Sequence, residues 1–206
     1  MTNPRFDEPE LYLLKNWSNA HLLEESMHKV REKYDQIFNE VLTKVQENYR
    51  ELDLSGPLHA KDEEGYVGIG KKTWPSMYGS WPSALRLENI RLEHLVSEDH
   101  EAPAAGVVVW PPKEVNVNFE EAKRKLSEVA EQGFGKKEFA WLPAENTKRW
   151  AWIGYSLPEP RQELLELLLR DEARGFIGRM VEHFDTLAKF IPVVDEIFQS
   201  GQQKRR

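Results

Sequence analysis

The sequence predicts an α+β fold in which a small, mostly antiparallel sheet of about five strands is flanked by long N- and C-terminal helices. Apolar residues recur at helical spacing near both ends of the 206-residue chain, and in the middle the period shortens from about 3.6 to 2. Hydrophobic residues make up 40% and charged residues 31%, too much of both for a disordered or a membrane protein. These observations together favour a folded domain.

Composition excludes several classes of function. The chain has no cysteine, which removes disulfides, thiolate metal sites and cysteine nucleophiles. No apolar stretch approaches the ~18 residues of a membrane span, and the first twenty residues lack the apolar block of a signal peptide, so we expect a cytoplasmic protein without a membrane partner. The formal net charge is −7, and nearly all of it lies in residues 1–64, which argues against nucleic-acid binding through bulk electrostatics.

The N-terminal region predicts one long helix. Residues 1–17 contain two prolines and predict an irregular lead-in or one short helix at about residues 10–17. Ser18 is the expected N-cap of a helix over residues 18–50. An apolar stripe with spacings of four and three runs along this helix, and it either packs on the rest of the chain or pairs with a second copy in a homodimer. The stripe consists of Leu23, Met27, Val30, Tyr34, Ile37 and Val41.

The α+β domain is expected over residues 65–198, packed with the long helix as one domain. Residues 51–64 hold Ser-Gly-Pro and a charged run, so they predict a surface loop. Period-two alternation then predicts strands at residues 66–70 and 85–94, the second with a bulge-like slip. The β-branched run at residues 107–110, stopped by Pro111 and Pro112, predicts a third strand.

The second half of the domain predicts a helix, a hairpin and a return to helices. Asn118 is the expected N-cap of a helix ending near residue 132, and residues 139–142 and 149–155 read as a hairpin. Helices follow from Pro160 to Phe198 with a bend at Gly175 or Gly178, and residues 199–206 form a basic, frayed tail. A second apolar stripe runs through Ala173, Ile177, Met180, Phe184, Leu187 and Ile191.

An acidic loop with two histidines is the strongest candidate for metal chemistry. His94 is followed by Glu98, Asp99, His100 and Glu101, and carboxylates and imidazoles are ligands of hydrolytic metal sites. A solvated acidic loop explains the same residues. We therefore assign no catalytic residue, no metal ligand and no cofactor.

Tryptophan is the distinctive residue type of this chain. Seven are present, four of them followed within two residues by proline, and basic residues lie nearby. Aromatic faces interleaved with cations are typical of single-strand nucleic-acid grooves and of protein interfaces, whereas filling of the core is the competing interpretation. The predicted binding residues are Lys71, Lys72, Trp74, Trp81, Trp141, Lys148, Arg149 and Trp150.

The tryptophan-rich segment carries a family resemblance. Residues 138–143 and 148–155, followed by a long helix, resemble a module that lies C-terminal to the nuclease core in some PD-(D/E)XK-superfamily proteins. The nuclease core of that superfamily has an aspartate near its second strand and a Glu-x-Lys on its third, whose carboxylates hold magnesium. The strand expected at residues 107–110 has no such residues, so the resemblance implies the order of elements over residues 65–198 and no catalytic position.

These observations favour a non-enzymatic binding module that uses a tryptophan-rich, locally basic sheet edge to bind a protein or a nucleic acid. The first alternative is a divergent metal-dependent nuclease or hydrolase of PD-(D/E)XK-like type that uses the acidic loop. The second is an inhibitor-like protein whose acidic N-terminal helix binds a basic partner.

Overall fold

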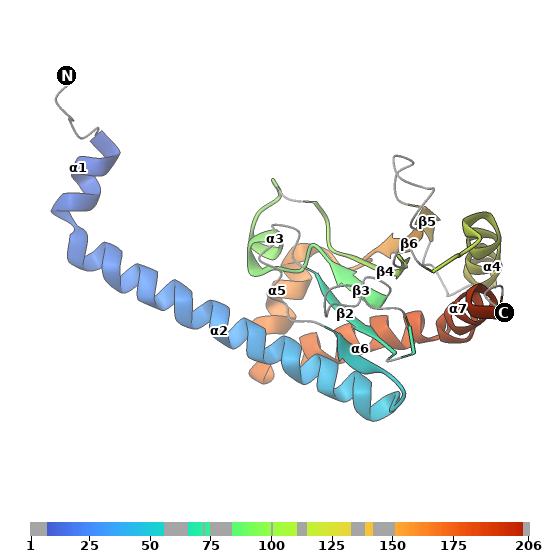
Figure 1. The fold of residues 1–206 in the computed structure, drawn as a ribbon. Helices are drawn as coiled ribbons and strands as arrows, with labels where there is room; N and C mark the ends of the chain where they lie inside the picture. Colours follow the sequence, from blue (N-terminus) through green and yellow to red (C-terminus); the bar gives the residue numbers. More distant parts are fainter. Residues whose placement is uncertain are drawn as a thin grey trace, which may run out of the picture. The chain divides into compact units, whose positions relative to one another are not determined.

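The computed structural model describes residues 8–55, 66–71, 73–74, 84–99, 101–110, 115–132, 139–141 and 151–203. Within these residues the fold is α+β, as predicted (Figure 1). The chain divides into two compact units, Met1–Gln36 and Ile37–Arg206, and the division falls inside the long helix α2. Among the described residues, no helix combines the length and the apolar character needed to cross a membrane.

The first unit contains helix α1 (Glu8–Lys15) and the first part of α2 (Trp17–Asn48). Residues 8–15 are therefore not an irregular lead-in but the short helix that was the alternative. The long helix is confirmed, but it begins one residue before Ser18, which is therefore not its N-cap. No residue from Glu8 to Lys33 is buried. These turns of α2 consequently gain nothing from a core within their own unit.

The second unit is built on an antiparallel sheet whose strand order is β1-β2-β3-β4-β6-β5. The register confirms the strands predicted at residues 66–70 and 107–110, and it confirms the pairing predicted for the hairpin at residues 139–142 and 149–155. The surface loop predicted at residues 51–64 is only partly correct, because residues 53–55 form β1. The strands are β1 (Asp53–Ser55), β2 (Val67–Gly70), β3 (Ala84–Glu88), β4 (Ala104–Val109), β5 (Ala140–Trp141) and β6 (Ala151–Ser156).

The strand predicted at residues 85–94 ends early. Asn89 has a φ of 56°, in the left-handed region, and its side-chain amide donates to the carbonyl oxygen of Ala102 at 3.2 Å. Asparagine tolerates this conformation better than most residues, so the chain turns there and continues as helix α3 (Leu92–Val96). The alternation of apolar and polar residues that predicted one strand therefore spans the end of β3, a turn and the start of α3.

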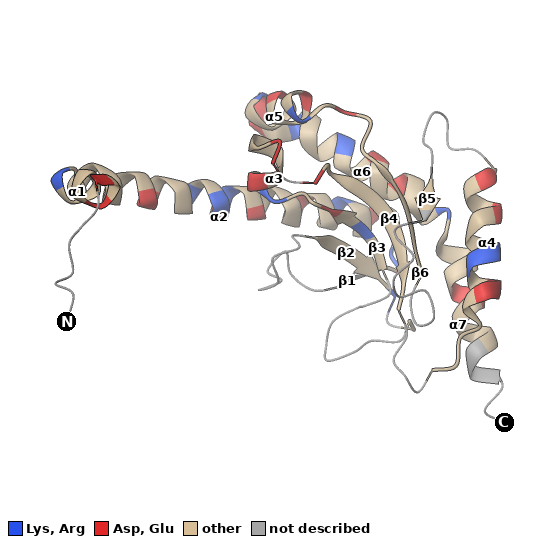
Figure 2. Ribbon diagram, turned by 90° about the horizontal axis from the view of Figure 1, so that it is seen from above, with Lys and Arg blue, Asp and Glu red and all other residues tan. Residues whose placement is uncertain are grey.

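One face of the sheet is apolar and forms the core. Ile69, Leu85, Val107 and Ile153 are aligned by the register across four strands, and each is at most 2% exposed. Helix α6 (Arg174–Ala188) lies across this sheet in both views (Figures 1 and 2) and contacts β3 and β4.

The remaining helices partly confirm the predicted pattern. Asn118 caps α4 (Phe119–Glu131) by accepting a hydrogen bond from the backbone, as predicted. The bend expected at a glycine instead falls at residues 171–173, a 3₁₀ turn with three consecutive positive φ values. Both glycines lie inside α6, since that helix begins at Arg174 after α5 (Arg161–Leu169).

The two apolar stripes have different surroundings. All six residues of the C-terminal stripe are buried, in or beside α6 and α7 (Ile191–Gln203). In α2, Tyr34 and Val41 are buried and Phe38 packs edge-to-face on Phe176 of α6, with 5.7 Å between ring centroids. The three earlier stripe residues are half-exposed or more: Leu23 by 63%, Met27 by 49% and Val30 by 49%.

Candidate functional site

Two of the predicted binding residues meet in the interior of the second unit. Lys71 Nζ lies 2.6 Å from one oxygen of Asp195, and the indole N–H of Trp74 donates to the other oxygen at 2.7 Å. Trp74 is only 2% exposed, and its ring lies against Phe198. The prediction that Trp74 forms a surface is therefore wrong, because a carboxylate on α7 satisfies its N–H inside the fold.

The other predicted residues give no surface that can be described. Lys72, Trp81, Lys148, Arg149 and Trp150 lie outside the described residues. The backbone of Trp141 pairs with Ile153, which places it on the edge strand β5. The binding face proposed from the sequence thus stays a prediction.

The sheet face opposite the apolar one carries a row of glycines. Gly68, Arg86, Gly106 and Gly154 are aligned by the register across β2, β3, β4 and β6. A β-carbon at Gly106 would lie 2.7 Å from the carbonyl oxygen of Ile153 and about as close to the Trp152 ring. The glycines leave the room that this indole occupies over the strands.

Trp152 and two charged residues form a polar cluster on this face. The indole N–H of Trp152 donates to Glu88 Oε1 at 2.9 Å, and Arg86 Nη1 lies 3.8 Å from the same oxygen. The guanidinium of Arg86 also stacks on the ring of Tyr66, 4.3 Å from its centroid. Because Arg86 is 9% exposed and held between a ring and a carboxylate, the cluster ties three strands together rather than presenting a charge. The alternation of Arg86 and Glu88 with leucines predicted the strand, but it gave no sign that the two charged side chains form a cluster.

A second buried polar cluster connects β6 to α6. His183 Nδ1 lies 2.9 Å from the Tyr155 hydroxyl, and His183 Nε2 lies 3.1 Å from Glu159 Oε2. A neutral imidazole satisfies both contacts, since Nε2–H donates to the carboxylate and Nδ1 accepts from the hydroxyl. Burial raises the pKa of Tyr155, so the phenol keeps its proton.

This geometry has the order of an acid–base relay, but it faces no solvent. Tyr155 is 4% exposed and His183 is 1% exposed. Neither side chain can meet a substrate, so we regard the cluster as a structural hydrogen-bond network that connects β6 to α6. The position of His183 next to Phe184, a residue of the C-terminal apolar stripe, was the only sign of this cluster in the sequence.

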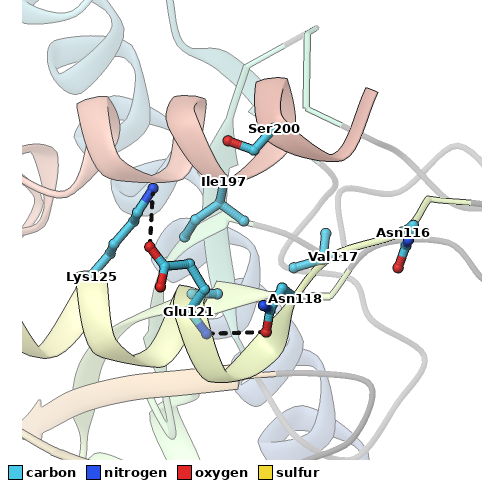
Figure 3. Close-up of a pocket in the computed structure, with 8 residues that line it drawn as sticks. Asn116, Val117, Asn118, Glu121, Lys125, Ile197 and Ser200 are labelled. Atoms are coloured by element: carbon cyan, nitrogen blue, oxygen red, sulfur yellow. Dashed lines mark hydrogen bonds and ion pairs between the residues drawn. The ribbon is translucent and has the colours of Figure 1, made fainter. Parts of the chain in front are cut away.

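A small pocket lies between α4 and α7 (Figure 3). Its volume is about 140 Å³, which holds a few water molecules of ~30 Å³ each and is below the ~300 Å³ of common ligand sites. Lys125 reaches Glu196 at 2.7 Å and Glu121 at 3.6 Å, and the hydrogen bond to Glu196 is the main cause of its raised pKa. The pocket is therefore a small gap between two helices that a salt bridge holds together.

The predicted metal site is not assembled by the described residues. His94 lies in α3 and is 8% exposed, and His100 lies outside the described residues. Across the part of the chain that the structure describes, no three histidine or carboxylate side chains are grouped so as to hold a metal ion. The hydrolase alternative therefore has no described geometry to support it.

A larger candidate site is a groove in the first unit. It has a volume of about 550 Å³ and is lined by ten residues of α1 and α2, within the range of ligand and peptide sites. α1 and α2 meet at an angle beside Asn16 (Figure 1). The lining residues are Tyr12, Leu13, Asn16, Asn19, Ala20, Leu23, Glu24, Met27, His28 and Arg31.

Exposed hydrophobic side chains are concentrated in the first unit. Nine large hydrophobic side chains between residues 11 and 30 are 43% to 68% exposed. Only three others of this kind are found among the described residues of the second unit: Val96, Trp110 and Leu169. The nine, which we call the N-terminal apolar residues, lie on more than one side of α1 and α2 and are Leu11, Tyr12, Leu13, Leu14, Trp17, Leu22, Leu23, Met27 and Val30.

Comparisons of the chain with protein-family models, with curated proteins and with solved structures found no match.

Proposed function

We propose that this chain is a non-enzymatic interaction module whose N-terminal unit binds a helical segment of a protein. The observation that carries the proposal is the groove of about 550 Å³ lined by α1 and α2, together with the exposure of the N-terminal apolar residues. Exposed apolar surface rimmed by polar residues is typical of interaction sites, and an amphipathic helix laid into an apolar groove is a recurring mode of recognition.

The energetics of the first unit support the same conclusion. The helix α1 has 8 residues, fewer than the ~12–15 below which isolated helices are marginal in water, and most helical stability in proteins comes from packing of an apolar face. No residue from Glu8 to Lys33 is buried. A bound partner would supply the packing that these turns lack.

The test compares the wild type with a double variant, Leu23→Glu/Met27→Glu, on the groove. The matched control, Ser18→Glu/Gln36→Glu, adds the same two charges at exposed positions on the opposite side of α2. Each purified protein is immobilised and incubated with an extract of cells that express it, and retained proteins, including further copies of the chain, are identified by mass spectrometry. We expect the wild type and the control to retain a partner that the groove variant loses.

The proposal is overturned if the wild type retains nothing that the groove variant fails to retain and stays monomeric at micromolar concentration. Circular dichroism of the variants supplies the control for folding.

The sheet edge around Lys148 and Arg149 stays a separate prediction. Replacing both residues by glutamate should weaken binding of single-stranded DNA or RNA, followed by tryptophan fluorescence at low salt, if that edge forms a basic aromatic groove. Unchanged quenching would remove that hypothesis without affecting the N-terminal groove.

A further inference from the structure

The N-terminal groove is lined by residues that also form a self-complementary stripe. Ala20, Leu23, Met27 and Val30 follow the spacing of three and four that places side chains on one face of α2. Three of these residues line the groove, and Val30 extends the stripe by one turn. A face that carries both the groove and the apolar ridge can pair with an identical face through a two-fold axis.

The exposed part of the stripe supplies the apolar centre of such an interface. Leu23, Met27 and Val30 are 63%, 49% and 49% exposed, and their burial removes apolar surface from water. A standard interface buries about 800 Å² on each partner, so flanking polar residues of α2 must complete it.

Charge selects the orientation of such a pair. Glu24 and Arg31 both line the groove and stand seven residues apart, on the same flank of the stripe. In an antiparallel pair with its two-fold axis near residue 28, Glu24 of each copy lies beside Arg31 of the other, so that two ion pairs form. In a parallel pair Glu24 faces Asn19 and Arg31 faces Ser26, which provides no opposite charges.

We propose that the partner of the groove is a second copy of this chain, packed antiparallel along α2 with Glu24 of each copy opposite Arg31 of the other. This inference rests on the proposed function, because it names the helical segment that the N-terminal unit binds. Figure 2 shows charges of both signs along α2, so a charge-swap experiment is possible on the helix itself.

The experiment measures dimerisation of four full-length proteins by analytical ultracentrifugation: the wild type, Glu24→Arg, Arg31→Glu and the double swap Glu24→Arg/Arg31→Glu. Each single variant replaces two attractions by two repulsions, and we expect the dimer dissociation constant to rise about tenfold. The double swap restores opposite charges across the interface, so its dissociation constant should return to within about threefold of the wild type.

The absence of cysteine allows an independent readout of orientation. Met27→Cys and Val30→Cys are prepared as single variants and mixed under mild oxidation. An antiparallel pair brings residue 27 of one copy to residue 30 of the other, so the mixed disulfide should exceed either homodisulfide, and mass spectrometry resolves the three products. Dominant homodisulfides would indicate a parallel pair and overturn the inference.

The outcomes separate this inference from the proposed function. A monomeric wild type that retains a different protein, lost in Leu23→Glu/Met27→Glu, removes the dimer and leaves the proposed function standing. A dimer that the groove variant abolishes but the charge variants do not affect refutes the antiparallel arrangement. A monomer that retains nothing refutes both.

Discussion

Replacing Gly154 by alanine should destabilise the second unit strongly, whereas the same substitution at Gly178 should stabilise it. A β-carbon at Gly154 would lie 2.5 Å from the carbonyl oxygen of Ala105 and 2.7 Å from Cζ3 of the Trp152 ring. At Gly178, in the exposed part of α6, a β-carbon would meet nothing within 4 Å. One chemical change thus probes two opposite environments.

The magnitude follows from what would have to move. Overpacking a core costs about 1–3 kcal/mol, and the obstacles at Gly154 are a backbone carbonyl on the paired strand β4 and a buried indole, so we expect about 3 kcal/mol. Alanine in place of glycine inside a helix contributes about 1 kcal/mol. The two variants should therefore differ by about 4 kcal/mol, or about a thousandfold in the unfolding equilibrium.

The assay is urea denaturation at neutral pH, followed by far-ultraviolet circular dichroism and by tryptophan fluorescence. The midpoint and slope of each transition give the free energy of unfolding. The reasoning is refuted if Gly154→Ala lies within about 0.5 kcal/mol of the wild type, the usual range of inconsequential surface substitutions, or if Gly178→Ala is the less stable of the two.

Three further predictions concern hydrogen bonds and titration. Trp74→Phe removes the N–H that donates to Asp195 and should lower the free energy of unfolding in urea by about 1.5–3 kcal/mol; a neutral result would contradict the assigned bond. Asn118→Ala removes the cap of α4 and should cost about 1 kcal/mol, while Asn118→Asp, which keeps the acceptor, should cost less. Burial raises the pKa of Tyr49 to about 12 and raises that of Tyr155 as well, both from an ordinary value of 10.0. The folded state therefore favours the neutral phenols, so stability is retained below pH 10 and falls as pH rises toward 12; Tyr49→Phe should reduce that loss in urea titrations across the range, and an unchanged slope would refute it.

Local pattern predicted the elements that depend on local sequence. Period-two alternation located β2, the β-branched valines before two prolines located β4, and the cap at Asn118 marked the start of α4. β1 was missed because it has only three residues, Asp53–Ser55, which are too few to show a period-two alternation. The early end of β3 was missed because a left-handed asparagine interrupts an alternation that continues in the sequence.

Long-range contacts could not be predicted in this way. The partner of Trp74 is Asp195, 121 residues away along the chain, and no local signal connects them. The stripe on α2 was recognised, yet its spacing is the same where it is buried, at Tyr34, and where it is exposed, at Leu23. Spacing identifies the apolar face of a helix, but it does not say whether that face is buried in the fold.

The strand order has a consequence for the kinetics of folding. β1, β2 and β3 each pair with the strand that follows them in the sequence, whereas β4 pairs with β6, which must reach it past the segment that holds α4 and β5. Long-range pairing is slow because the entropy of loop closure is lost before the contacts form. We expect docking of β6 on β4 to limit the folding rate, so that truncating Ile153 in that pairing slows refolding, while truncating Leu23 leaves the refolding rate of the second unit unchanged.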